Sequence, residues 1–209
     1  MKKLDLLIAG MGGQGIILAS DIIAEVALAS GYDVKKTDTR GMAQRGGSVV
    51  SQVRVAEQVF SPLIRPGEAD MLLAFEKLEA ARWAYYLGGG GTVIVNNLAL
   101  PPLTVTLGYD SYPGDEEIIN LTKRQKNHVY LVSGTDRVKE LGNIRTLNIF
   151  MLGCASLRLP FSVSTWEEVI AQRLPAKIKQ INLSAFKQGR KEMPGIHLRE
   201  GLQDIMGDE

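Results

Sequence analysis

Apolar residues along the chain form two kinds of segment. Short apolar runs, many of them rich in β-branched residues, are typical of strands buried in a parallel sheet. They predict strands over residues 4–9, 48–55, 71–75, 92–96, 103–107 and 128–132, and we expect a further strand over residues 33–38. Longer segments with apolar residues at helical spacing predict helices over residues 16–30, 76–87, 115–126, 143–159, 164–174 and 175–187. This alternation predicts an α/β fold, with a Rossmann-like, mostly parallel sheet, helices on both faces and a helical C-terminal part.

Glycine and capping residues indicate where these elements end. Gly31 and Gly189 are suitable stops for the first and the last helix. Four consecutive glycines at residues 88–91 predict a flexible link before the next strand. Residues 164–168 offer a capping box for the helix that they begin. Residues 58–60 could pair with the strand over residues 48–55.

The composition is that of an ordinary globular protein. The chain has 209 residues, of which 45% are hydrophobic, and we expect one domain over residues 1–189 and a polar tail over residues 190–209. A formal net charge of +1 gives no bulk attraction to nucleic acid or to a membrane surface. Because no apolar run suits a signal sequence or a membrane span, we expect a cytoplasmic protein. The single cysteine, Cys154, excludes an intrachain disulfide and a cluster site made of four cysteines of this chain.

A glycine-rich segment connects the first strand with the first helix. This glycine loop, residues 10–15, reads GMGGQG and matches G-x-G-x-x-G through Gly10, Gly12 and Gly15. Glycines allow a sharp turn and let a phosphate approach the N–H groups at the start of the helix. Asp38 has the position of a ribose-binding acid, so a stand-alone NAD(P)-binding dehydrogenase is one interpretation. An anion site, for which Gln14 could donate a specific hydrogen bond, and a purely structural role of the glycines are the alternatives.

A second glycine-rich segment follows the second strand, within DTRGMAQRGGSVVSQVR (residues 38–54). It offers arginine, amide and hydroxyl groups but no Cys or His, so it suits an anion or another chain better than acid–base or metal chemistry. Its core is the second loop, residues 45–48, which consists of Arg45, Gly46, Gly47 and Ser48. Both loops follow strand ends, so we expect them at the same carboxyl edge of the sheet.

Six stretches carry a family resemblance. In chain order they read GMGGQGIILAS, GMAQRGGSVVSQVR, SPLIRPGEADMLLAFEKLEAAR, VIVNN, ELGNIRTLNIFMLG and INLSAFKQG. Together they resemble the small (beta) subunit of indolepyruvate:ferredoxin oxidoreductase. More broadly, they are similar to the gamma subunit of 2-oxoacid:ferredoxin oxidoreductases, which corresponds to domain III of fused pyruvate oxidoreductases. The resemblance covers about residues 4–189, and a pyruvate- or 2-oxoglutarate-type gamma subunit is the nearest alternative.

The resemblance implies a subunit of a complex that is inactive alone. Such a complex oxidatively decarboxylates an aryl 2-oxoacid and transfers the acyl group to coenzyme A. Thiamine diphosphate, Mg²⁺ and iron–sulfur clusters are then expected on a larger partner subunit, through which ferredoxin is reduced. In isolation, an uncovered docking face could pair with itself and give a homodimer.

At the matching positions, the resemblance implies that both loops face the cleft for the substrate or coenzyme A. The residues concerned are Gly10, Gly12, Gly13, Gln14, Gly15, Arg45, Gly46, Gly47 and Ser48. Arg45 suits a carboxylate or a phosphate, and Ser48 with backbone N–H groups would complete the site. Arg45 could equally dock the partner subunit, since arginine is enriched at interfaces, so the two roles stay open.

Other polar residues are interpreted more simply. Glu76 and Glu79 are expected in a solvated first turn, where their charge favours the helix dipole, although a site role for Glu76 stays open. Asn148, inside an apolar helix, needs a hydrogen-bond partner and could cap a neighbouring loop. Cys154 is expected to be buried and inert, and Trp166 to be a packing anchor. His128 and His197 are isolated, so they do not indicate a metal site.

Overall fold

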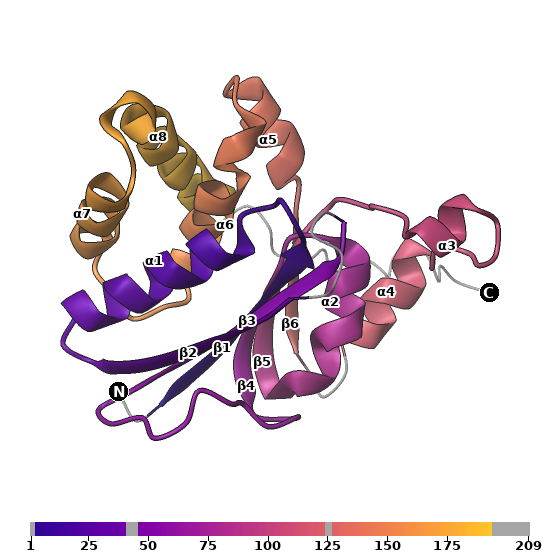
Figure 1. The fold of residues 1–209 in the computed structure, drawn as a ribbon, viewed down its shortest axis with the longest axis horizontal. Coiled ribbons are helices and arrows are strands. Elements are labelled where there is room, and N and C mark those ends of the chain that lie inside the picture. Colours follow the sequence, from indigo (N-terminus) through magenta and orange to yellow (C-terminus); the bar gives the residue numbers. More distant parts are fainter. Residues whose placement is uncertain (1–2, 41–45, 124–126, 194–209) are drawn as a thin grey trace, which may run out of the picture.

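A six-stranded sheet forms the centre of the molecule (Figure 1). The computed structural model describes residues 3–40, 46–123 and 127–193. The strands are β1 (Leu4–Met11), β2 (Asp33–Arg40), β3 (Ser48–Ala56), β4 (Ala69–Ala74), β5 (Leu87–Asn96) and β6 (His128–Val132). Their order is β2-β3-β1-β4-β5-β6, in which β1, β4, β5 and β6 are parallel and β3 is antiparallel to both of its neighbours. The predicted mostly parallel α/β sheet is therefore confirmed, with β3 as an antiparallel insertion.

Helices cover both faces of this sheet, as predicted (Figure 1). They are α1 (Ile16–Ala29), α2 (Lys77–Trp83), α3 (Leu103–Thr106), α4 (Asp115–Thr122), α5 (Gly134–Glu140), α6 (Leu147–Ser156), α7 (Val163–Arg173) and α8 (Ala176–Glu192), with 3₁₀ turns η1 (Ala84–Tyr86) and η3 (Ile144–Thr146). Helices α1, α6, α7 and α8 pack on one face, whereas α2 packs on the other. Among the described residues, no helix is both long and apolar enough to cross a membrane.

The side chains of each strand divide the core between the two faces. In β3, Val53 and Val55 are buried in the core cluster that includes residues of α1, and Val49 packs partly against the same cluster. Val50 belongs to the cluster on the opposite face. This alternation was expected, because neighbouring residues of a strand point to opposite faces.

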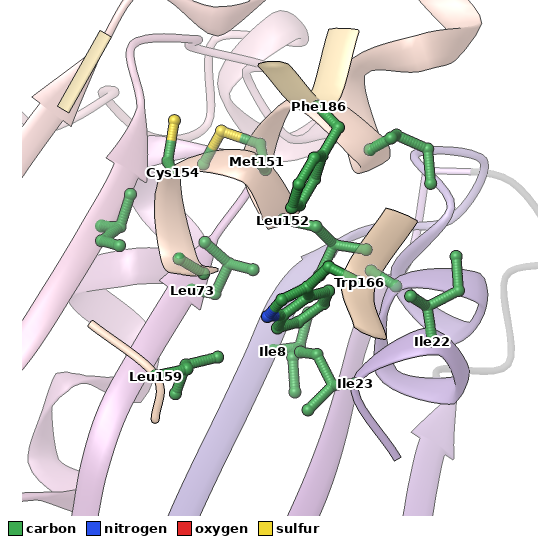
Figure 2. Packing of buried hydrophobic residues seen from close by; sticks show 14 of the residues in the cluster. Ile8, Ile22, Ile23, Leu73, Met151, Leu152, Cys154, Leu159, Trp166 and Phe186 are labelled. Atoms are coloured by element: carbon green, nitrogen blue, oxygen red, sulfur yellow. The ribbon is translucent and has the colours of Figure 1, made fainter. Parts of the chain in front are cut away.

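Trp166 anchors the larger core cluster (Figure 2). Its indole is fully buried, with its centroid 6.2 Å from that of Phe161 and 5.9 Å from that of Phe186. Cys154 is buried in the same cluster, and this burial raises the pKa of its thiol well above the ordinary value. Both predictions, a packing anchor at Trp166 and an unreactive buried thiol at Cys154, are consistent with this environment.

Helices α6 and α8 are in backbone contact, which corrects one predicted boundary. Helix α8 passes through Gly189 and continues to Glu192, so Gly189 does not end it. A β-carbon at Gly189 would collide with the carbonyl oxygen of Phe150, and one at Gly153 with that of Phe186. Gly189 is therefore needed for close helix packing rather than for termination.

Three other predicted segments differ from the structure. Residues 88–91 belong to β5, where a β-carbon on Gly88 would lie only 3.0 Å from the carbonyl oxygen of Gly67. Residues 103–107 do not form a strand, because α3 occupies Leu103–Thr106. Residues 58–60 form no strand either.

The remaining differences concern helix ends. Helix α7 begins after Ser162, whose Oγ accepts a hydrogen bond from the Thr165 N–H at 3.1 Å, so the expected capping box is not its cap. The helix predicted over residues 76–87 ends at Trp83, and the one over 143–159 starts as η3 before α6. Helix α5 was not predicted.

Candidate functional site

A cleft of about 640 Å³ opens at the carboxyl edge of the parallel strands. The glycine loop after β1 forms one side of this cleft, through Gly13, Gln14 and Gly15. The segment after β5 and the segments around α5 and the start of α6 form the other sides. Ligand sites of parallel α/β sheets occur at this edge, and the volume is within the usual range for small-molecule sites.

Internal hydrogen bonds shape the glycine loop. The Gln14 side chain accepts from the Met11 N–H at 2.7 Å and donates from Nε2 to the Phe75 carbonyl at 3.2 Å. Gln14 therefore uses both ends of its amide within the chain, so its first role is to hold the loop against the end of β4. The Gly12 N–H donates to the Gly47 carbonyl at 2.8 Å, so the glycine loop and the second loop are in contact, as expected.

Two glycines of the GMGGQG motif are required by the local geometry. Gly15 precedes α1 with φ 81°, and a β-carbon there would lie 2.7 Å from Asn148 Nδ2. Gly10 belongs to β1 rather than to the loop, and a β-carbon there would lie 2.6 Å from Gln14 Oε1. Gly13 has φ 103° and faces open space. The structure thus gives Gly10 and Gly15 packing roles and leaves Gly13 accessible at the cleft.

The start of α1 is electrostatically suited to an anion. No side chain caps the first turn, and this turn has no acidic residue. The first N–H groups of a helix lack intrahelical partners and carry partial positive charge. Lys139 and Arg145 add two exposed cationic side chains to the lining of the same cleft, and the Lys139 ammonium also pairs with the exposed Asp136 at 3.2 Å. Lys139 comes from a segment without a motif, whereas Arg145 lies in the stretch ELGNIRTLNIFMLG, in which no site residue was predicted.

The walls beside these charged groups are apolar. Leu98 and Leu100 come from the segment after β5, and Ile144 and Leu147 from the segment that leads into α6. A cleft with apolar walls and a few convergent polar groups is typical of a site for a small organic ligand.

Glu79 holds the second loop through a hydrogen bond with Ser48. The Ser48 hydroxyl donates to Glu79 Oε2 at 2.5 Å, and the same carboxylate accepts from Trp83 Nε1 at 3.2 Å and from Arg82 at 2.7 Å. Because Ser48 already donates to a carboxylate, its hydroxyl proton is not free for an anionic ligand. Gly46 is exposed next to Ser48, whereas Arg45 lies outside the described residues.

Glu76 holds the segment after β5 that forms one wall of the cleft. The Glu76 carboxylate caps α2 by accepting from the Glu79 N–H at 2.9 Å, and it also accepts from the Leu100 N–H at 3.0 Å and from the Tyr112 hydroxyl. Both Glu76 and Glu79 are only 1% exposed, so the expected solvated first turn is wrong. Burial and the hydrogen bond to Glu76 raise the pKa of Tyr112 above its ordinary value.

Asp38 is bound by other residues of the chain. Its carboxylate accepts from the Ser51 hydroxyl at 2.6 Å and pairs with Lys36 at 3.2 Å. Strand β3 lies between β2 and β1, so Asp38 is not on the strand adjacent to the glycine loop. This arrangement gives no support to a ribose-binding role or to a dinucleotide enzyme.

Metal-ligating side chains do not gather within residues 3–40, 46–123 and 127–193. No group of three or more His, Cys, Asp and Glu side chains in these ranges could hold a metal ion. His128 begins β6 and is exposed, whereas His197 lies outside the described residues.

Comparison with known proteins identifies similar sequences over nearly the whole chain. The family model described as pyruvate ferredoxin/flavodoxin oxidoreductase matches residues 5–192. The indolepyruvate oxidoreductase subunit IorB of Pyrococcus horikoshii is 36% identical, and the alignment covers 91% of this chain and 96% of that protein. The 2-oxoglutarate synthase subunit KorC of Methanothermobacter marburgensis is 27% identical, with 91% and 96% covered.

Two solved structures share the fold. The 2-oxoglutarate:ferredoxin oxidoreductase from Magnetococcus marinus, with 2-oxoglutarate, coenzyme A and succinyl-CoA bound, gives a TM-score of 0.72 at 22% identity. The match covers 94% of the present chain but 32% of that one. The keto/oxoacid ferredoxin oxidoreductase gamma subunit from Geobacter sulfurreducens gives a TM-score of 0.67 at 24% identity, with 92% and 99% covered.

Proposed function

This chain belongs to the pyruvate ferredoxin/flavodoxin oxidoreductase family, and we propose that it is the small subunit of a complex acting on indolepyruvate or another aryl 2-oxoacid. Its place as a subunit of a 2-oxoacid:ferredoxin oxidoreductase follows from relatives of matching length. The choice of an aryl substrate rests on the IorB relatives at 35–36% identity, against 26–28% for the KorC relatives.

The cleft beside the glycine loop is the observation that carries this proposal. Its apolar walls suit an organic ring, whereas Lys139, Arg145 and the start of α1 suit a carboxylate or a phosphate. Indolepyruvate and coenzyme A each combine such parts. In the proposed reaction, the 2-oxoacid loses CO₂, its acyl carbon forms the thioester with coenzyme A, one proton is released and two electrons pass to ferredoxin.

The reactive cofactors are assigned to a larger subunit in this proposal. An iron–sulfur cluster needs several thiolates, usually four, and the chain has one cysteine, which is buried. Thiamine diphosphate, Mg²⁺ and the clusters would therefore be held by the partner, which also reduces ferredoxin. Phe60, Leu107 and Tyr109 are largely exposed and provide apolar surface of the kind used in docking.

Co-purification tests the proposed assembly. The full chain, tagged and expressed in its native source, is expected to retain a larger subunit whose sequence carries cysteine motifs for iron–sulfur clusters. A panel of indolepyruvate, pyruvate and 2-oxoglutarate then ranks the substrates by kcat/KM. Purification of the chain without any such subunit, under mild conditions, would argue against the proposal.

The role of Arg45 is tested separately by Arg45→Ala in that complex. If Arg45 binds the ligand, the complex assembles and the KM for coenzyme A or for the 2-oxoacid rises. If Arg45 docks the partner, the subunits separate at lower salt concentration than in the wild type, because interface charges are screened by salt.

A further inference from the structure

The orientation of one buried amide is set by its neighbours. Asn96, at the carboxyl end of β5, is fully buried, and its Nδ2 donates to the Phe75 carbonyl at 3.1 Å and to Thr135 Oγ1 at 2.8 Å. Its Oδ1 accepts from the Thr135 N–H at 3.1 Å. A carbonyl oxygen can only accept and a backbone N–H can only donate, so the amide of Asn96 has one possible orientation.

This orientation determines what the Thr135 hydroxyl can do. A hydroxyl has one proton to donate, and the oxygen of Thr135 already accepts from Asn96. The proton of Thr135 is therefore left for another acceptor, and no described residue accepts it. Thr135 is 7% exposed and lines the cleft, so a bound ligand can supply the missing acceptor.

Asn148 has a free donor at the same cleft. Its Oδ1 accepts from the Ile149 N–H at 2.9 Å, which leaves Nδ2 available as a donor. This Nδ2 lies against Gly15 at the start of α1 and donates to no described residue. Asn148 is 5% exposed and lines the cleft. Asn148 Nδ2 is not among the fully buried atoms without a partner, so it is open to the cleft, where a ligand or water can accept its hydrogen bond.

We propose that Thr135 and Asn148 form a binding subsite for an oxyanion, either a phosphate of coenzyme A or the carboxylate of the 2-oxoacid. Each side chain has a donor left for a ligand, and both sources offer acceptor oxygens. The uncapped start of α1 adds N–H groups, and Lys139 and Arg145 add positive charge. The choice of these two sources rests on the proposed function, whereas the donor geometry stands without it.

Thr135→Val tests the hydroxyl, because valine keeps the shape and removes the donor. It also removes the acceptor of Asn96 Nδ2, and thermal unfolding measures that separate loss of stability. Calorimetry with the full chain, and KM in the complex, are expected to show binding about tenfold weaker, as for the loss of one hydrogen bond to a charged group. Thr135→Ser keeps the donor and is expected to restore binding. Thr122→Val is the control, since Thr122 is also buried but does not line the cleft.

Asn148→Asp tests the second donor by replacing it with an acceptor. The substitution replaces Nδ2 by an acceptor oxygen of nearly the same size, and it places a negative charge beside the expected oxyanion. Binding is expected to weaken by more than tenfold. Thermal unfolding of each variant verifies that the chain is folded before binding is compared.

Two probes distinguish the sources of the oxyanion. If the substitutions raise the KM for coenzyme A alone, the subsite binds a phosphate; if they raise that for indolepyruvate alone, it binds the carboxylate. Wild-type affinity for both in folded Thr135→Val and Asn148→Asp would overturn the proposal. Loss of binding equal to that of Thr122→Val would also overturn it. A complex that oxidises no 2-oxoacid yet binds coenzyme A through these residues would instead contradict the proposed function alone.

Discussion

At the scale of single residues, the polar groups around the cleft are fixed by specific partners. Gln14 bonds to Met11 and Phe75, and Glu76 bonds to Leu100 and Tyr112. Such buried networks stabilise one arrangement strongly, because a broken bond leaves a polar group without water. The positions of the cleft walls therefore depend on individual side chains outside the glycine motif.

Gly15→Ala is expected to destabilise the chain more than Gly13→Ala. Both residues have positive φ, which costs a non-glycine residue about 1 kcal/mol or more. Only at Gly15 would the new β-carbon also meet Asn148, whereas nothing lies near it at Gly13. Urea unfolding of the two variants measures the difference. Equal losses in the free energy of unfolding would show that the contact with Asn148 is unimportant.

Tyr112→Phe is expected to lower the free energy of unfolding by about 1–3 kcal/mol near neutral pH, because the buried Glu76 loses a donor. The pKa of Tyr112 is raised in the folded state, so folding favours the protonated phenol. This stabilisation is complete below the unfolded pKa of about 10 and is lost as the pH rises above it. The wild type should therefore lose more stability than Tyr112→Phe between about pH 10 and pH 12. Parallel pH profiles would disprove this coupling.

At the scale of secondary structure, local sequence patterns predict an element correctly where its burial pattern is regular. Strand β6 and the start of α1 agree with the residues predicted, because uniform apolar runs and a glycine loop mark them. Residues 88–91 and Gly189 were misassigned, because their glycines serve close contacts with β4 and α6 that are remote in sequence. The glycine loop of the site was predicted correctly, because its motif lies directly between the first strand and the first helix.

The rest of the cleft lining could not be predicted from local sequence. Thr135, Lys139 and Arg145 line the same cleft as the glycine loop, although they come from α5 and η3, far from that loop in the sequence. Only the tertiary fold brings these segments together. Thr135 and Lys139 carry no motif and α5 itself was not predicted, whereas Arg145 lies in a stretch that carries the family resemblance but had no assigned role. The one partial signal was Asn148, whose position in an apolar helix called for a partner.

Gly189→Ala is expected to be among the most destabilising single substitutions in the chain. Its methyl group would collide with the Phe150 carbonyl and force α6 and α8 apart, at a cost of about 3 kcal/mol or more. Gly114→Ala is the control, since nothing lies near its β-carbon and its φ is negative. Thermal unfolding should show a large loss for the first and little change for the second. A small loss for Gly189→Ala would mean that the helices can move apart easily.

At the scale of the whole molecule, the chain provides a cleft at one edge of a sheet and lacks the thiols for electron transfer. The described residues supply oriented donors, two cations and apolar walls, which bind and position a ligand. The family places this chain in a 2-oxoacid:ferredoxin oxidoreductase. The function proposed for it is therefore a division of labour, in which this subunit shapes the cleft and a larger subunit carries out the oxidation.

Reduction of a viologen dye by indolepyruvate and coenzyme A tests this division of labour most directly. The assay compares the purified chain, the larger subunit co-purified with it, and the two recombined under anaerobic conditions. We predict no dye reduction by this chain alone and restored reduction when the subunits are recombined. Dye reduction by the purified chain without a partner would contradict the account.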